Sequence, residues 1–145
     1  EGIERFAADF PQMNLAVSLH APREELRKKL IPRAPSEIKA LIPALKKYFA
    51  ATKRLVTFEY AMIKGVNDSI KEAKELCALL SGFDCKVKLI PLNDVPGGEF
   101  QPSAKETLER FVDYLKERDM NVTIRRSWGG TVGGACGQLA DKRNN

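Results

Sequence analysis

The sequence contains one cysteine in a setting that could make it reactive. Cys136 lies in the segment GGTVGGACGQL, in which five of eleven residues are glycine. Glycine permits unusual backbone dihedrals and close approach to another molecule, and an accessible thiol reacts as its thiolate. Arg125 and Arg126 lie near enough in sequence to favour the thiolate form. The residues alone leave two interpretations of Cys136, a reactive thiol or an idle cysteine in the polar tail.

Polar side chains also fall at the ends of two predicted strands. Ser18 and His20, the only histidine, share one face at the end of the segment NLAVSLHA, and Asn93 ends KVKLIPLN. Parallel sheets carry their ligands at the carboxyl ends of their strands. His20 is therefore either a ligand contact or a structural histidine. Asn93 is either a ligand contact or a turn former.

Glu59 and the two remaining cysteines are easier to interpret. Glu59 alternates with apolar neighbours in a strand, so its carboxylate either accepts hydrogen bonds from a ligand or pairs with a lysine of a neighbouring strand. Cys77 and Cys85 lie on apolar faces and are expected to be small buried hydrophobes. The three cysteines show neither CxxC nor zinc-site spacing, so they should be free thiols, with no metal site in this chain.

Hydrophobic periodicity predicts the elements that must position these residues. Alternation with a period of two predicts strands over 14–21, 55–63, 86–93 and 121–126, and helical periodicity predicts helices between them. Pro43 lies inside the helix predicted over about 37–53, where a kink or a split is expected. Ser69 with Glu72, and Ser103 with Glu106, have the spacing of capping boxes. This alternation indicates an α/β fold with a parallel sheet and right-handed crossovers.

The faces of the first two strands differ in a way that favours a barrel. One face carries small or polar residues, such as Ser18 and Glu59, whereas the other is apolar. Helices cover both faces of an open doubly wound sheet, so both should then be apolar. A barrel interior that holds a ligand would produce the observed asymmetry.

Composition and charge narrow the class of protein further. The chain has 145 residues, 43% of them hydrophobic, which is enough for one domain with a buried core. It has no long apolar run and no secretory pattern, so we expect a cytoplasmic protein without membrane contact. The net charge of +5 suits a phosphate-rich partner. Because the chain begins at Glu1 with residues typical of a helix end, we expect a piece of a longer protein.

Four motifs in order give a more specific indication. The segments NLAVSLHAPREELR, VTFEYAMIKGVNDS, LIPLNDVPG and GGACGQL resemble the carboxyl-terminal half of the radical-SAM adenine methyltransferases. The resemblance implies methylation of carbon 2 of an adenine in 23S ribosomal RNA and in some transfer RNAs. It implies half of a partial (β/α) barrel, with about four mainly parallel strands and outer helices. Residues 1–145 would be a single fragment, in which 127–145 form the catalytic cysteine loop and polar tail.

The resemblance also implies roles for individual residues. Ser18, Leu19 and His20 match the SLH motif that holds S-adenosylmethionine, and Asn93 matches an asparagine that contacts the same cofactor. Cys136 matches the cysteine that one S-adenosylmethionine methylates. A second one, cleaved reductively at a [4Fe-4S] cluster, gives a radical that takes hydrogen from the new S-methyl group. The resulting carbon radical adds to the adenine, and another cysteine resolves the covalent bond.

Parts of the family pattern are missing from these residues. The cluster motif CxxxCxxC, the first three strands and the second catalytic cysteine do not occur. We therefore expect the [4Fe-4S] cluster to be bound by residues absent from this chain, and the fragment to be inactive alone. Related enzymes methylate carbon 8 of adenine, and these motifs do not separate the two activities.

Two other classes of function remain open at this stage. A stand-alone basic α/β module could bind RNA while Cys136 stays idle, and a thiol redox protein is the weakest candidate because no resolving cysteine lies nearby. Half a barrel would leave the strand over 14–21 with an unpaired edge, so we expect self-association through that edge.

Overall fold

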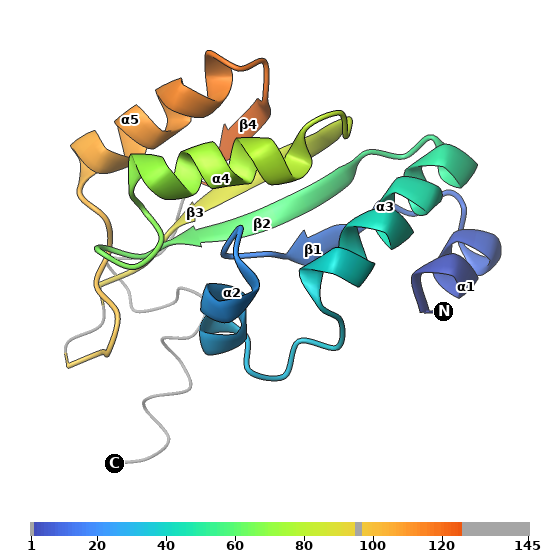
Figure 1. The fold of residues 1–145 in the computed structure, drawn as a ribbon, viewed down its shortest axis with the longest axis horizontal. Helices are drawn as coiled ribbons and strands as arrows, with labels where there is room; N and C mark the ends of the chain where they lie inside the picture. Colours follow the sequence, from blue (N-terminus) through green and yellow to red (C-terminus); the bar gives the residue numbers. More distant parts are fainter. Residues whose placement is uncertain (1, 95–96, 126–145) are drawn as a thin grey trace.

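The computed structural model describes residues 2–94 and 97–125, and these residues form one parallel sheet with helices between its strands (Figure 1). The elements in chain order are α1 (Gly2–Asp9), β1 (Ala16–Ser18), α2 (Glu24–Leu30), α3 (Ile38–Thr52), β2 (Val56–Met62), α4 (Ile70–Leu80), β3 (Cys85–Pro91), α5 (Lys105–Lys116) and β4 (Asn121–Ile124). The predicted α/β class with four parallel strands is confirmed.

The strands are arranged in the order in which they occur in the chain. The sheet runs β1-β2-β3-β4, and every pairing is parallel. Each crossover therefore moves one strand further in the same direction, and right-handed crossovers of this kind place the helices on a single face. Figure 1 shows α3, α4 and α5 on that face. Such winding is that of a barrel wall, because a doubly wound sheet reverses direction.

Burial of one face of β2 forms the centre of the core. Val56, Phe58, Tyr60 and Met62 are all fully buried, whereas the residues between them are half-buried. The helices cover these side chains with buried leucines, including Leu45, Leu76 and Leu115. The apolar face of the sheet thus packs on the helices, and the small or polar face remains open, as the sequence predicts.

The first predicted capping box is confirmed only in its serine half. Ser69 is the N-cap of α4, and its Oγ accepts a hydrogen bond from the backbone N–H of Glu72 at 3.5 Å. The Glu72 carboxylate accepts from Arg23 Nη2 at 2.6 Å and from the Ser69 hydroxyl. A charged partner from the β1–α2 loop has therefore replaced the backbone amide of Ser69, because a charge-assisted hydrogen bond is the stronger one.

The second predicted capping box is wrong. The N-cap of α5 is Ala104, without a side-chain hydrogen bond, and the helix begins at Lys105. Ser103 Oγ instead donates to Asp68 Oδ2 at 2.8 Å. In a capping box the serine oxygen would accept from a helix N–H, whereas here the hydroxyl donates a charge-assisted hydrogen bond to the carboxylate on the loop before α4.

Two further predictions about the elements need correction. Of the kink or split expected at Pro43, the split does not occur, since α3 runs as one helix from Ile38 to Thr52, and the kink stays a prediction. Pro43 removes one backbone donor near the start of the helix, on the exposed side, where water can satisfy the carbonyl left without a partner. The first strand is also shorter than predicted, because His20 has a φ of 56° and ends the extended conformation.

Leu76→Ala should lower the free energy of unfolding by about 2–5 kcal/mol, because it leaves a cavity in the fully buried core. Leu79 of the same helix is only partly buried, so Leu79→Ala should cost less. Chemical denaturation of both variants measures the difference, and equal losses would contradict the described packing.

Candidate functional site

The carboxyl ends of the strands lie at one edge of the sheet, because all the strands are parallel. We call this the carboxyl edge and define it by Ser18 and His20 after β1, Ile63 after β2, and Asn93 after β3. The sequence-predicted residues Ser18, His20 and Asn93 are thus brought to the same edge by β1 and β3, which lie on either side of β2. Asn93 is half-buried there, two residues beyond the end of β3.

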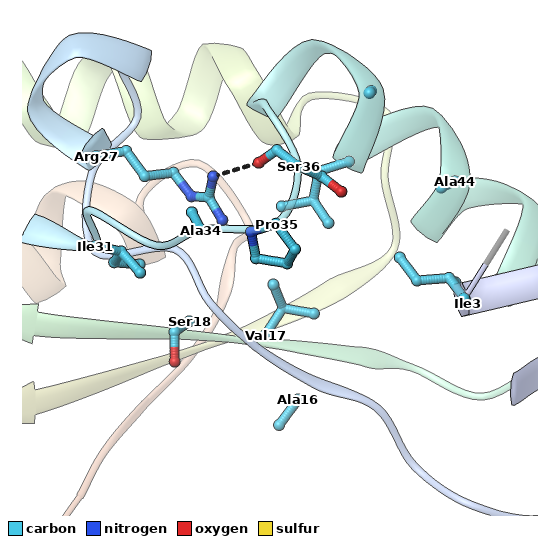
Figure 2. A pocket seen from close by; sticks show the side chains of 13 residues that line it. Ile3, Ala16, Val17, Ser18, Arg27, Ile31, Ala34, Pro35, Ser36 and Ala44 are labelled. Atoms are coloured by element: carbon cyan, nitrogen blue, oxygen red, sulfur yellow. Dashed lines mark hydrogen bonds between the residues drawn. The ribbon is translucent and has the colours of Figure 1, made fainter.

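Ser18 and Leu19 direct their side chains to opposite sides of the sheet. Ser18 is exposed on the open face, and Figure 2 shows its hydroxyl directed away from the helices. Leu19 is fully buried in the core, and its backbone N–H donates to the carbonyl of Glu59 at 2.9 Å. A ligand on the open face could therefore meet the side chain of Ser18 but only the backbone of Leu19.

His20 is held by both its backbone and its ring. Its backbone N–H donates to the Glu59 carbonyl at 3.3 Å, and its Nδ1 accepts from the backbone N–H of Ala61 at 3.0 Å. Because Nδ1 accepts a hydrogen bond, the proton of the neutral ring lies on Nε2. His20 therefore presents one hydrogen-bond donor.

The surroundings of His20 favour this neutral form. Desolvation by burial is the main cause that lowers its pKa from the ordinary value of 6.5. The positive charge of Arg27 lowers the pKa further, whereas the negative charge of Glu59 opposes both. At neutral pH the ring is uncharged, so it interacts with a ligand as a donor rather than as a cation.

Asn67 is the residue at this site that the sequence did not single out. Its side chain is fully buried between the ends of β1 and β2. Asn67 Nδ2 donates to the backbone carbonyls of His20 at 2.8 Å and Ala61 at 2.6 Å, and Oδ1 accepts from the backbone N–H of Ile63 at 2.8 Å. The available signal was an asparagine in the turn directly after a buried strand, where such side chains bond to nearby backbone.

Glu59 takes the second of the two roles that its sequence allowed. Lys88 lies beside it in the parallel register of β2 and β3, and Lys88 Nζ lies 3.4 Å from Glu59 Oε1. Both side chains are on the open face. This ion pair supplies the carboxylate with a counterion, so the open face carries no strong local excess of negative charge at Glu59.

The cysteines in the described part of the chain are not reactive groups. Cys85 is buried at the start of β3, and desolvation is the main cause that raises the pKa of its thiol to about 12. Cys77 is only half-buried on α4, so its predicted burial is met in part, and desolvation raises its pKa as well. Both therefore remain protonated at neutral pH. Cys136 and Arg126 lie outside the described residues.

A hollow of about 580 Å³ lies beside β1, on the side facing α2 and α3 (Figure 2). Val17 points into it, opposite to Ser18, and apolar side chains form most of its wall. Arg27 also lines it, with 3% of its surface exposed; its Nη1 donates to the Ser36 carbonyl at 2.7 Å, and its Nε has no partner among the described residues. The helix-side face of β1 thus borders an apolar hollow that contains a buried guanidinium, whereas the open face presents the hydroxyl of Ser18.

Residues 2–94 and 97–125 contain no group of three or more His, Cys, Asp or Glu that could hold a metal ion. No helix in the same ranges is long and apolar enough to cross a bilayer.

The sheet winding is that of a (β/α)-barrel segment, and its carboxyl edge is polar. Proteins of known sequence and structure share this segment. Over 141 residues the chain is 45% identical to the probable dual-specificity RNA methyltransferase RlmN of Bacillus thuringiensis (strain Al Hakam). The match covers 97% of this chain and 39% of that protein. The equivalent protein of Bacillus cereus (strain B4264) matches equally well. No family model matches the chain.

Solved structures agree with this assignment. A radical SAM methyltransferase from Sphaerobacter thermophilus superposes with a TM-score of 0.87 at 46% identity, over 94% of this chain and 40% of that chain. A domain of the pyruvate-formate lyase-activating enzyme from Bacteroides vulgatus shares the fold, with a TM-score of 0.68 at 14% identity. Over nearly all of its own length the chain is thus similar to radical-SAM methyltransferases, and it spans about two fifths of the length of these relatives.

The pKa of His20 gives a prediction for the dependence of stability on pH. Because folding lowers this pKa, the unfolded chain takes up a proton at higher pH than the folded chain. The free energy of unfolding should therefore be highest above about pH 6.5, and should fall as the pH is lowered through the folded-state pKa. His20→Gln should remove this dependence between about pH 7 and pH 5, where carboxylates contribute little. Urea denaturation as a function of pH tests it, and a stability that rises toward pH 5 would be contrary to the site geometry.

Proposed function

We propose that the chain is the part of a radical-SAM RNA methyltransferase that contacts S-adenosylmethionine and carries the cysteine to be methylated. One observation carries the proposal: Ser18, His20 and Asn93 gather at one carboxyl edge, in a chain that aligns with RNA methyltransferases over 97% of its length. In a stand-alone RNA-binding module nothing would require these three uncharged polar groups to meet.

The chemistry of the carboxyl edge fits this cofactor. The Ser18 hydroxyl, the Nε2–H of His20 and the Asn93 amide can donate hydrogen bonds without adding charge, and Leu19 can contribute only backbone groups. S-Adenosylmethionine offers matching acceptors in its carboxylate, ribose hydroxyls and adenine, and when bound it supplies the methyl group. The protein would orient the cofactor through these donors on the open face of the sheet.

The described residues do not fit an iron–sulfur cluster, since none of them form a suitable ligand group. We assign the [4Fe-4S] cluster to a part of the enzyme outside this chain and expect the 145 residues to be inactive alone. In the enzyme, Cys136 would accept the methyl group as a thiolate and then contact the substrate base.

The proposed substrate is an adenine of 23S ribosomal RNA, and also of transfer RNA, methylated at carbon 2. Arg125 is exposed immediately after β4, and its position beyond the carboxyl end of that strand suits contact with an RNA phosphate. Such contacts are independent of sequence and weaken as salt increases. Methylation at carbon 8 is the alternative reaction, and a cytoplasmic location is part of the same proposal.

We also propose that the isolated chain self-associates through the outer edge of β1. Backbone groups of Leu15 and Leu19 bond to β2, so in a parallel strand the alternate residues, Ala16 and Ser18, direct theirs outward. Both outward-facing residues are exposed. A row of exposed backbone groups at a sheet edge is a template for pairing with a second copy.

Replacing the matching segment of the Bacillus thuringiensis protein with this chain should give an active chimera. Cys136→Ala should abolish its RNA methylation, because it removes the thiol proposed to accept the methyl group, while RNA affinity stays nearly unchanged. The chimera is expressed in a strain without its own enzyme, and nucleosides from its 23S and transfer RNA are analysed by liquid chromatography with mass spectrometry. The mass detects methyladenosine, and the retention time distinguishes methylation at carbon 2 from methylation at carbon 8.

Cys77→Ala is the matched control, because Cys77 is a half-buried thiol on α4 with a raised pKa. It should leave methylation intact. Full turnover by Cys136→Ala would contradict the assigned role. A large loss of RNA affinity with retained turnover in the same variant would also contradict it.

Ala16→Pro should convert self-associated chains to monomers, because proline removes an outward N–H and is tolerated in an edge strand. Light scattering at tens of micromolar protein measures the mass. A strictly monomeric unsubstituted chain would contradict the proposed edge pairing.

A further inference from the structure

Asn67 links the ends of the first two strands through every polar group of its side chain. Nδ2 donates to two backbone carbonyls, one on each strand end, and Oδ1 accepts from the backbone of Ile63. Its own carbonyl accepts from the Tyr60 hydroxyl at 2.8 Å. A fully buried amide with all these bonds satisfied is rigid, because any movement leaves a buried polar group unpaired.

The same amide holds His20 in an unfavourable backbone conformation. His20 has a φ of 56°, which is uncommon for a residue with a Cβ atom. Asn67 Nδ2 bonds to the His20 carbonyl, and it also bonds to the carbonyl of Ala61, whose N–H donates to His20 Nδ1. Asn67 therefore fixes both the backbone of His20 and the backbone donor that determines which ring nitrogen carries the proton.

We propose that Asn67 is a positioning residue, which holds His20 so that its Nε2–H donates a hydrogen bond to an acceptor atom of the bound ligand. The identity of that ligand as S-adenosylmethionine rests on the proposed function, whereas the positioning of His20 does not. The acceptor is an oxygen or an unprotonated nitrogen, since a donor group of the ligand would face the Nε2–H without a partner.

The charged groups around the site are compatible with this assignment. Glu59, beside β1 on the open face, is paired with Lys88, and Arg27 lies on the other side of β1. Asp68, next to Asn67, accepts from the backbone N–H of Gly65 and from Ser103. Neither carboxylate accepts a hydrogen bond from the ring of His20, so among residues 2–94 and 97–125 the Nε2–H has no partner and is left for a ligand.

Two substitutions separate positioning from stability. Asn67→Ala removes the bonds to His20 and Ala61, whereas Tyr60→Phe removes the buried hydrogen bond to the Asn67 carbonyl and leaves the side-chain amide intact. Both should lower the midpoint of thermal unfolding, because each leaves a buried backbone group unpaired. Only Asn67→Ala should release the ring of His20.

Nitrogen-15 NMR of the 145-residue chain reports the tautomer directly, because His20 is its only histidine. The unsubstituted chain and Tyr60→Phe should show the Nε2–H tautomer in large excess. In Asn67→Ala, or in Asn67→Asp, which keeps Oδ1 but loses the donors, that excess should fall severalfold. A protonated Nδ1 in the unsubstituted chain at neutral pH overturns the proposal without any variant.

Calorimetry of the chimera tests the consequence for binding. Asn67→Ala should weaken S-adenosylmethionine binding by about tenfold, the effect of losing one well-placed polar contact, and Tyr60→Phe should change it by less than about twofold. Equal effects of the two substitutions, or an unchanged His20 tautomer in Asn67→Ala, would overturn the role of Asn67. If the unsubstituted chimera does not bind S-adenosylmethionine but His20 has the described tautomer, the proposed function is contradicted. The positioning of His20 by Asn67 would not be affected by that result.

Discussion

Burial of one face of β2 determines which side chains the sheet can offer to a ligand. Its four inward residues are fully buried under the helices, so its register cannot shift by one position without exposing all of them. Through the parallel pairing, this register places Ser18 beside Glu59 and Glu59 beside Lys88. The polar open face is thus a direct consequence of the apolar core on the other face.

The alternation of buried and exposed side chains along β1 ends at His20, one of the residues proposed to contact the ligand. Leu19 still points into the core, but His20 adopts a positive φ, and a side chain from the next loop takes over the bonding of the strand ends. Asn67 replaces the ladder hydrogen bonds that a longer β1 would have made. The result is a rigid strand end that presents a neutral donor, which is a polar contact suited to recognising a ligand without attracting a counterion.

The sequence was sufficient for those features that depend on periodicity. The number and order of the strands, the buried faces of β2 and α4, and the buried Cys85 all follow from apolar spacing and are confirmed, although β1 is shorter than predicted. Side-chain hydrogen bonds were predicted less well, because the partners of a polar group include residues distant in sequence that only the tertiary structure brings close. Ser103 bonds to Asp68 rather than capping α5, and Asn67, part of an ordinary turn sequence, connects two strands. The ion pair between Glu59 and Lys88 could not be predicted, because it depends on the register between β2 and β3, which composition does not provide.

We propose that the cofactor binds on the open face of β1, at the carboxyl edge, rather than in the hollow on the helix side of the same strand. A crystal structure of the chimera with S-adenosylmethionine distinguishes these two positions most directly. We expect the ligand to contact Ser18, the Nε2 of His20 and Asn93. A ligand seated against Val17 and the buried guanidinium of Arg27, with His20 free of contacts, would contradict it.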